Sequence, residues 1–401
     1  MKNKLKAVLL TTDSIPKYGG IADYLHGILS HTVHVIDWFA YSTIGHGDFD
    51  DSSLPYSMFR LPDSRRLGKR WGDGFFLTRK LNTLLWQINR GREACDLVNR
   101  IRAEHNPDFI VIARWCEESK YWCEACRRSE MSYFIFAYGL ELVEEYTPAL
   151  ENQRKCDFND SRKIISISDC TTKCLAELGI SGDKITKLCP GIVPEKLMKL
   201  DENEVLNKMQ AWGLSGRKFI LSLGALVKRK GFDNAIKAFD EIADKYGDLD
   251  IVVAGRGDHG SVVKETAENA RHSDRVHLLG DVSHQDKQAL MQSCEFYIMP
   301  NRLIPGDMEG FGIVFLEANM YNKAVIGGNN GGVPDAIEDG VSGLLVDTSG
   351  SLQPIIDAMK KLLDDADYAS SLGSAGYKRA MDQFTWEKLG AHFYKIVSNL
   401  N

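Results

Sequence analysis

Short apolar runs alternate with helical segments along the whole chain, and the alternation starts again near the middle. The first series of apolar runs is LKAVLLTTD, HVIDW, PDFIVIAR, SYFIFAYG and RKIISIS, and the second is RKFILSLGAL, LDIVVAGRG, DRVHLLGD, CEFYIMP, KAVIGG and SGLLVD. Strands that alternate with helices form parallel sheets, because each parallel connection needs a crossover that a helix can supply. The pattern predicts an α/β protein with two doubly wound, Rossmann-like domains facing across a cleft.

The length of the chain agrees with two domains, since 401 residues is about twice a comfortable single domain. The stretch CPGIVPEKLMKLDENE separates the two series, so we place the first domain at 1–195 and the second at 196–375. The tail, 376–401, has apolar side chains at helical spacing and is expected to form a helix that packs back on the first domain. Ligands of such sheets bind beyond the carboxyl ends of the strands, so we expect the site in the cleft.

Composition and charge exclude several classes of protein. The net charge of −6 argues against bulk nucleic-acid binding. No apolar run approaches the ~20 residues that span a membrane, and the apolar run at the start is too short for a signal peptide. Nine cysteines, an odd number, without an export signal indicate a reduced protein of the cytoplasm.

The cysteine spacing does not predict a metal site. Cys123 and Cys126 form a CxxC with Cys116 nearby, but a zinc site would need a second pair at short spacing. We therefore expect free thiols. The DxD strings at Asp48–Asp50 and Asp248–Asp250 are interpreted as accidental, the second because it lies just before a strand, so the sequence predicts no metal.

The segment Glu309–Ala318, EGFGIVFLEA, carries two carboxylates and two glycines. Gly310 and Gly312 let backbone N–H groups approach a ligand. A helix is expected to begin near Ile313, where free N–H donors and the positive end of the dipole suit a phosphate. Glu309 could then accept hydrogen bonds from a sugar, and Glu317 from a ribose. On spacing alone, an ordinary loop and an exposed helix with unrelated glutamates remain an alternative.

The longer segment MEGFGIVFLEANMYNKAVIGGNNGGVPDAIEDGVSGLLVD resembles the signature of the family-4 retaining glycosyltransferases (glycosyl transferases group 1), which have the GT-B fold. The family pattern of two glutamates separated by seven residues matches Glu309 and Glu317, with GFG between them. KYGGIADYL resembles the N-terminal glycine loop of the family, LVKRKGFDNAI its basic phosphate loop, and FTWEK its final helix. The likeness covers nearly the whole chain and is more specific in the C-terminal half.

This resemblance implies retaining transfer of a sugar from a nucleotide-diphosphate sugar (UDP- or GDP-sugar) to a saccharide or lipid-linked saccharide, as in cell-surface glycan synthesis. The acceptor hydroxyl would attack on the face that the diphosphate leaves, and a phosphate oxygen would take the proton. No protein nucleophile, metal or further cofactor is implied. The site residues implied, from the first domain to the second, are Gly19 and Gly20 at the donor phosphates, Lys230 at the diphosphate, the backbone near Val282 at the base, the backbone N–H groups of Gly310, Phe311 and Gly312, Glu309 at the donor sugar and Glu317 at the ribose.

Lys230 is also expected to act in catalysis on chemical grounds, because a fixed cation stabilises the charge that develops on a leaving diphosphate. Read alone, KRKG is equally typical of a basic surface. The family often has an arginine five residues before this lysine, where this chain has Ala225. Arg229, which we count among the donor-binding residues, could compensate.

A second departure lies in the first domain, where Tyr138 of YGLE stands in place of the histidine of the family's HGxE. We place Tyr138 with Glu309 and Lys230 as a catalytic candidate. A phenol donates hydrogen bonds but is a poor proton acceptor near neutral pH. Three alternatives stay open: a nucleotide-sugar epimerase, a glycan phosphorylase of the same fold, and a catalytically weak partner subunit.

Two further segments allow other interpretations. GRGDHG at Gly255–Gly260 matches GxGxxG, with Asp274 downstream, and suggests NAD. The dinucleotide fingerprint normally follows the first strand of its domain and this one follows the second, so we do not expect NAD. The segment 60–92 interleaves basic and aromatic residues, which suits peripheral contact with the anionic inner face of a membrane. A solvated basic face with buried aromatics is the alternative.

Overall fold

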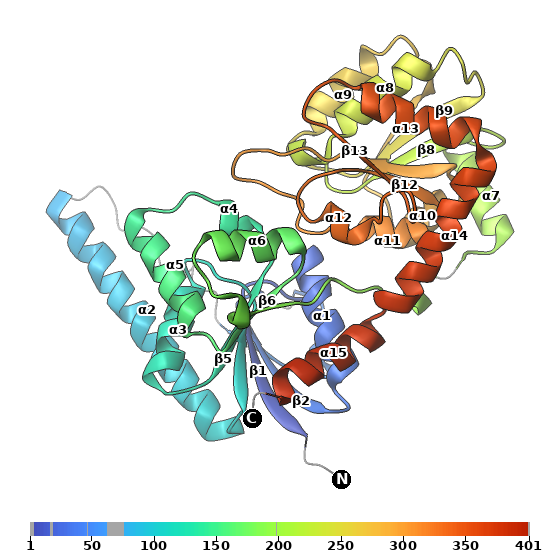
Figure 1. Cartoon of the computed structure of the whole chain (residues 1–401). Helices are drawn as coiled ribbons and strands as arrows, with labels where there is room; N and C mark the ends of the chain where they lie inside the picture. The colour runs from blue at the N-terminus through green and yellow to red at the C-terminus, as the bar shows by residue number, and fades with distance from the viewer. Residues whose placement is uncertain (1–3, 17–18, 46, 62–75, 198, 400–401) are drawn as a thin grey trace. The chain divides into compact units, whose positions relative to one another are not determined.

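The computed structural model describes residues 4–16, 19–45, 47–61, 76–197 and 199–399, with the backbone alone for 76–86. The chain divides into two compact units (Figure 1). Unit 1 comprises residues 1–188 together with 386–401, and unit 2 comprises residues 189–385. Each unit contains one parallel sheet covered by helices, which confirms the predicted pair of Rossmann-like folds.

Unit 1 has a seven-stranded sheet in the order β3-β2-β1-β4-β5-β6-β7, and every pairing is parallel. The strands are β1 (Leu5–Thr11), β2 (Ile36–Ser42), β3 (Ser57–Arg60), β4 (Phe109–Ile112), β5 (Tyr133–Ala137), β6 (Lys163–Ser166) and β7 (Ile185–Lys187). The sequence pattern found the five inner strands and missed β3 and β7. These two form the edges of the sheet, where exposure on one side removes the continuous apolar run.

The two faces of this sheet are covered by different helices. The helices are α1 (Gly20–Thr32), α2 (Phe76–His105), α3 (Ser119–Arg128), α4 (Leu140–Val143), α5 (Pro148–Asp160), α6 (Asp169–Glu177) and α15 (Trp386–Ser398). Alternate residues of the central strands, such as Val8 and Ile110, form a core with α2, α3 and α5. Phe136, on the opposite face, contacts Tyr24 of α1 and Phe393 of α15.

Unit 2 has a six-stranded parallel sheet in the order β10-β9-β8-β11-β12-β13. Its strands are β8 (Lys218–Leu223), β9 (Leu249–Ala254), β10 (Val276–Gly280), β11 (Phe296–Met299), β12 (Ala324–Gly328) and β13 (Leu344–Val346). All six were predicted. β9, β11 and β12 are buried along their whole length, as expected when helices cover both faces of a parallel sheet.

The helices of unit 2 form two layers around its sheet (Figure 1). One layer consists of α8 (Phe232–Ile242), α9 (Gly260–Glu268) and α13 (Gln353–Asp364). The other contains α7 (Glu202–Ala211), α10 (His284–Ser293), α11 (Ile313–Asn319), α12 (Val333–Ala336) and α14 (Ala366–Gln383). The carboxyl ends of β8, β10 and β11 lead into the loops that carry the predicted site residues of unit 2.

The last helix, α15, belongs to unit 1 and lies beside α1, although it follows α14 of unit 2 directly in the chain (Figure 1). Trp386 begins α15 and packs edge-on against Tyr24, with ring centroids 5.2 Å apart. Gly27 of α1 faces the Trp386 indole, and a Cβ at position 27 would lie 2.1 Å from the ring. The absence of a side chain at position 27 therefore sets the close approach of α1 and α15.

Among the described residues, no helix is both long and apolar enough to cross a bilayer. The basic and aromatic segment 60–92 lies partly outside the described residues, which exclude 62–75 and the side chains of 76–86. Arg60, at the start of this segment, pairs with Asp51 and donates to the Ser14 hydroxyl at 3.1 Å.

The α1–α15 contact gives a paired test of packing. Gly27→Ala should lower the free energy of unfolding by about 1–3 kcal/mol, because the new methyl group collides with the buried Trp386 ring. Gly91→Ala in α2 should raise it by about 0.5–1 kcal/mol, because nothing lies near its Cβ and alanine favours the helix. Urea unfolding measures both changes, and a stabilising Gly27→Ala would contradict the packing described.

Candidate active site

The loop after β8 brings basic residues to the carboxyl edge of the unit 2 sheet. After Leu223 the chain runs through Gly224 to a short 3₁₀ turn, Lys228–Lys230, and then into α8. Gly231 joins the turn to α8 with φ near 70°, and a Cβ there would lie 2.2 Å from the carbonyl oxygen of Pro300 after β11. A glycine at 231 is thus required for the loop to lie against the end of β11.

The Lys230 side chain folds back beside the backbone of Gly224. A Cβ at position 224 would lie 2.7 Å from the Lys230 Nζ. Within the described residues this ammonium group forms neither a hydrogen bond nor an ion pair. Burial lowers the pKa of Lys230; the charges of Glu309 and Glu317 oppose this shift, whereas those of Arg229 and Lys287 add to it. Lys230 is therefore a partly desolvated cation without a direct partner.

Glu309 lies in the loop after β11 and faces the neighbouring cation, Arg229. The Arg229 Nε is 3.3 Å from the Glu309 Oε2, and the Arg229 Nη1 is 3.5 Å from Asp307. The Glu309 Oε2 and Arg229 Nε are both buried, and neither has a hydrogen-bond partner within the described part of the chain. The carbonyl of Glu309 accepts from the Gly332 N–H at 2.8 Å, which fixes the loop that carries this carboxylate.

Glu317 lies in the second turn of α11 and is paired with Lys287 of α10. The Lys287 Nζ lies 2.5 Å from the Glu317 Oε2, and both side chains are largely buried. Val282, the residue predicted near the base, lies half-buried in the turn just before α10. The partner of the Glu317 carboxylate and the turn at Val282 thus both belong to α10 or the residues just before it.

The glycine loop before α11 has the predicted form. The helix begins at Ile313 as expected, after Gly312 with φ near 88°. Phe311 is buried, and its ring packs on Phe384 with centroids 5.8 Å apart. In the described structure the backbone amides of Gly310 and Phe311 donate to no other residue. The helix has only seven residues, so these amides rather than a long helix dipole are what the loop offers a ligand.

The remaining predicted residues lie in unit 1. Gly19 precedes α1 with φ near 152°, and a Cβ at position 19 or 20 would meet only open space. Tyr138 follows β5, and its hydroxyl is buried without a hydrogen-bond partner among the described residues. Burial raises the pKa of Tyr138 well above its ordinary value, so the phenol keeps its proton. Its backbone N–H donates to the buried Glu141 carboxylate at 2.5 Å.

Sequence reasoning missed the groups that hold these residues in place. Lys287, the partner of Glu317, looks like an ordinary helical lysine because its contact is long-range. Asn301, fully buried after β11, accepts from the Gly328 N–H at 2.9 Å through its side chain and from the Thr348 hydroxyl at 2.9 Å through its carbonyl. The one available signal was the polar pair Asn301–Arg302 directly after an apolar strand.

The GxGxxG segment Gly255–Gly260 packs against the loop after β8. A Cβ on Gly255 would lie 1.9 Å from the Gly224 carbonyl oxygen, and one on Gly257 would lie 2.4 Å from that of Leu226. The His259 N–H also donates to the Leu226 carbonyl at 2.8 Å. These glycines thus have a packing role that explains the motif without NAD.

The acidic and cysteine motifs have structural roles as well. Asp50 caps a 3₁₀ turn by accepting from the Ser52 N–H, and Asp250 is buried at the amino edge of the sheet, where it binds Arg217 and His277. Cys123 and Cys126 are free thiols in the unit 1 core, where burial raises the pKa of Cys126 to about 12. Among the described residues, no three His, Cys, Asp or Glu side chains form a group that could hold a metal ion.

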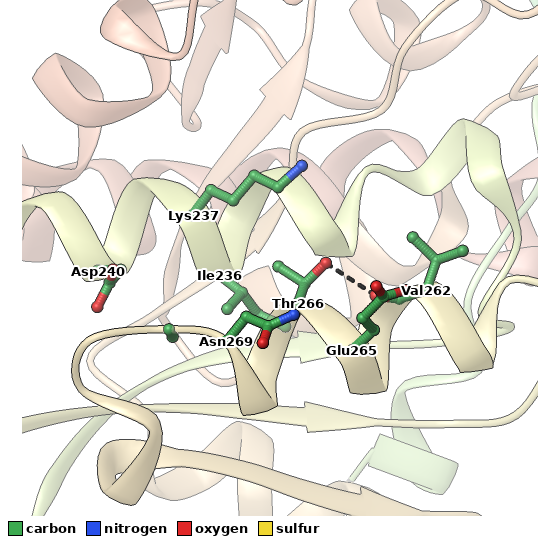
Figure 2. Close-up of a pocket in the computed structure, with 8 residues that line it drawn as sticks. Ile236, Lys237, Asp240, Val262, Glu265, Thr266 and Asn269 are labelled. Atoms are coloured by element: carbon green, nitrogen blue, oxygen red, sulfur yellow. Dashed lines mark hydrogen bonds between the residues drawn. The ribbon is translucent and has the colours of Figure 1, made fainter.

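A groove of about 380 Å³ lies between α8 and α9, away from these residues (Figure 2). The Thr266 hydroxyl in its wall donates to the Val262 carbonyl at 2.8 Å. The lining residues are Ile236, Lys237, Asp240, Val262, Glu265, Thr266, Asn269 and Ala270. None of them is a predicted site residue, so the groove is not the candidate active site.

Comparison with known proteins agrees with this arrangement. Residues 206–379, which contain the basic loop and both glutamates, match the family model of the glycosyl transferases group 1. This segment of the chain is therefore similar to the group 1 glycosyl transferases. A GDP-mannose-dependent alpha-(1-6)-phosphatidylinositol monomannoside mannosyltransferase of Mycolicibacterium smegmatis is 23% identical to this chain over 98% of both chains.

Solved structures share the fold of this chain. A glycosyltransferase from Rickettsia africae superposes with a TM-score of 0.79 at 14% identity, over 99% of both chains. The HepE protein of Anabaena, solved with UDP and glucose, superposes with a TM-score of 0.76 at 16% identity, over 98% of this chain and 100% of that one. This likeness confirms the predicted GT-B fold.

The charges around Lys230 predict opposite pKa shifts in two variants. Lys287→Met removes a cation and frees Glu317, so the pKa of Lys230 should rise, whereas Glu317→Gln removes an anion and should lower it. Carbon-13 NMR of methylated lysines can follow the titration, with the Lys230 signal assigned by its loss in Lys230→Arg. Lys208→Met, which breaks a similar pair with Asp286, is the control and should leave this pKa unchanged. Equal shifts in both test variants would contradict the site geometry.

Proposed function

We propose that this chain is a retaining, metal-independent hexosyltransferase that moves a sugar from a nucleotide-diphosphate sugar to a saccharide or lipid-linked saccharide. The observation that carries this proposal is the ammonium group of Lys230, which has no hydrogen-bond or ion-pair partner among the described residues. Arg229 faces Asp307 and Glu309, and Lys287 is paired with Glu317. A buried cation without a partner is costly, and an anionic ligand would offset that cost.

A diphosphate is the anion that best suits the surroundings of Lys230. Within the described residues the N–H groups of Gly310 and Phe311 donate to no other residue, and such backbone N–H groups donate well to phosphate oxygens. Gly19 and Gly20 of unit 1, with open space at their Cβ positions, would let backbone approach the phosphates. The amides, the glycines and Lys230 together would bind a −2 charge without any metal.

In the proposed reaction, Lys230 stabilises the charge that grows on the diphosphate as the bond to the sugar breaks. The acceptor hydroxyl attacks from the same face and a phosphate oxygen takes its proton, so Glu309 acts as a ligand of the donor sugar and forms no covalent intermediate. Glu317, held by Lys287, would accept hydrogen bonds from the ribose, and the backbone at Val282 would contact the base. Tyr138, which keeps its proton, would donate to a sugar hydroxyl.

GDP-mannose is the first donor to test, because the relative from Mycolicibacterium smegmatis that aligns over 98% of the chain depends on it. The acceptor of that relative is a phosphatidylinositol monomannoside, which supports a lipid-linked acceptor here. A cytoplasmic enzyme that touches the inner face of the membrane through 60–92 would reach such an acceptor.

Transfer from radiolabelled GDP-mannose to membrane glycolipids tests this function. Lys230→Met and Glu309→Gln should each lower kcat by about 10²–10³-fold, because each removes a group placed at the developing charge or at the sugar. Lys237→Met, on the exposed face of α8, is the matched control and should keep the wild-type rate. Wild-type rates in both site variants would refute the site assignment.

The product of the same assay tests the reaction type. NMR should show the anomeric configuration of the donor retained, and EDTA should leave the rate unchanged. Free epimerised sugar nucleotide, or a requirement for inorganic phosphate, would identify the epimerase or phosphorylase alternative. Donor binding without transfer to any acceptor would favour the alternative that Ala225 and Tyr138 suggest, a catalytically weak partner subunit.

A further inference from the structure

Arg302, three residues beyond the end of β11, contacts the basic loop after β8 at several atoms. Its backbone N–H donates to the Arg229 carbonyl at 2.7 Å, and its Nε donates to the Lys228 carbonyl at 2.8 Å. The two ends of its guanidinium group bind the Asp233 carboxylate in a fork, with distances of 2.8 and 3.1 Å. One residue thus connects the basic turn to the first turn of α8.

The surroundings hold this guanidinium group in one orientation. Asp233 is only 4% exposed, and the side chain of Arg302 is 17% exposed. The His259 Nε2 lies 3.3 Å from the Arg302 Nη2 and 3.6 Å from the Asp233 Oδ1. A forked arginine–carboxylate pair away from water is geometrically specific, so the Nε of Arg302 is aimed at the basic turn.

Within the described residues, few other hydrogen bonds fix the backbone of the turn. It is three residues long and ends at the left-handed Gly231. Its own hydrogen bonds are Lys230 N–H to the Val227 carbonyl at 3.0 Å and Gly231 N–H to the Lys228 carbonyl at 3.4 Å. Arg302 therefore binds two of the three carbonyls in the turn that directs the Arg229 and Lys230 side chains.

We propose that Arg302 is a positioning residue that orders the Lys228–Lys230 turn and thereby sets Lys230 for the donor diphosphate. It acts through the turn and not as a ligand of the diphosphate, because Asp233 occupies its fork. The consequence for the donor depends on the proposed function, whereas the order of the turn does not.

The same unit contains a matched control at the opposite edge of its sheet. Arg217 binds Asp250 through both ends of its fork, Asp250 is fully buried, and the His277 Nε2 lies 2.8 Å from Asp250. This cluster contains the same three residue types, arginine, aspartate and histidine, as the cluster around Arg302. It lies at the amino ends of β8, β9 and β10, so its loss tests the general cost of removing such a pair.

Amide hydrogen exchange on the full-length apo protein tests the proposal. In Arg302→Gln, peptides that cover 225–232 should exchange about tenfold faster, since a hydrogen bond from a charged donor is lost from the turn. Arg302→Lys, which keeps the charge but not the fork, should recover only part of this protection. Arg217→Gln should lower the melting temperature and leave exchange in 225–232 unchanged. If Arg302→Gln does not fold, Asp233→Asn, which weakens the fork, should show the same local acceleration.

Unchanged exchange in 225–232 of folded Arg302→Gln or Asp233→Asn would overturn the proposal, and so would equal acceleration in Arg217→Gln. A transfer assay separates this failure from failure of the proposed function. If the turn exchanges faster but Lys230→Met transfers at the wild-type rate, the function is wrong and the ordering role stands. If the ordering role of Arg302 and the proposed function are both correct, Arg302→Gln should raise the donor KM about tenfold, whereas Arg217→Gln should not.

Discussion

Backbone packed directly against backbone at the carboxyl edge of the unit 2 sheet is the constraint on which the candidate site depends. Loops from neighbouring strands approach more closely than any side chain would permit, as at Gly231 against Pro300 and Gly255 against Gly224. Such packing places the turn that carries Lys230 beside the loop that carries Glu309. The glycines at these positions therefore determine where the charged groups lie.

Several charges at this edge are paired, whereas the partly buried Lys230 has no ion-pair partner among the described residues. Glu309 and Asp307 share Arg229, and Glu317 holds Lys287. A protein interior does not ordinarily keep a desolvated ammonium group unpaired, because its desolvation is not offset. An unpaired, partly buried ammonium group such as that of Lys230 is what we expect in an anion-binding site before the anion binds. In unit 1, the hydroxyl of the protonated Tyr138 is also buried and has no hydrogen-bond partner among the described residues.

The sequence predicted the sheets well because most of their strands contain apolar runs, and it missed β3 and β7 because these two strands are short and partly exposed. It also placed the start of α11 at Ile313, since a glycine that must be left-handed marks that boundary. The chemical roles of Glu309, Lys230 and Tyr138 came from a resemblance and stay predictions. Lys287 and Arg302 were out of reach, because each acts through a partner that is remote in sequence and no local pattern encodes such a contact.

Calorimetric titration of the wild type and of Lys230→Met with GDP and with guanosine tests the central claim most directly. If the Lys230 ammonium group binds the diphosphate, the variant should bind GDP at least about tenfold more weakly than the wild type and guanosine with unchanged affinity. UDP in place of GDP should give the same difference if uracil is the base of the donor. Equal affinity of both proteins for the diphosphate that the wild type binds would contradict the account.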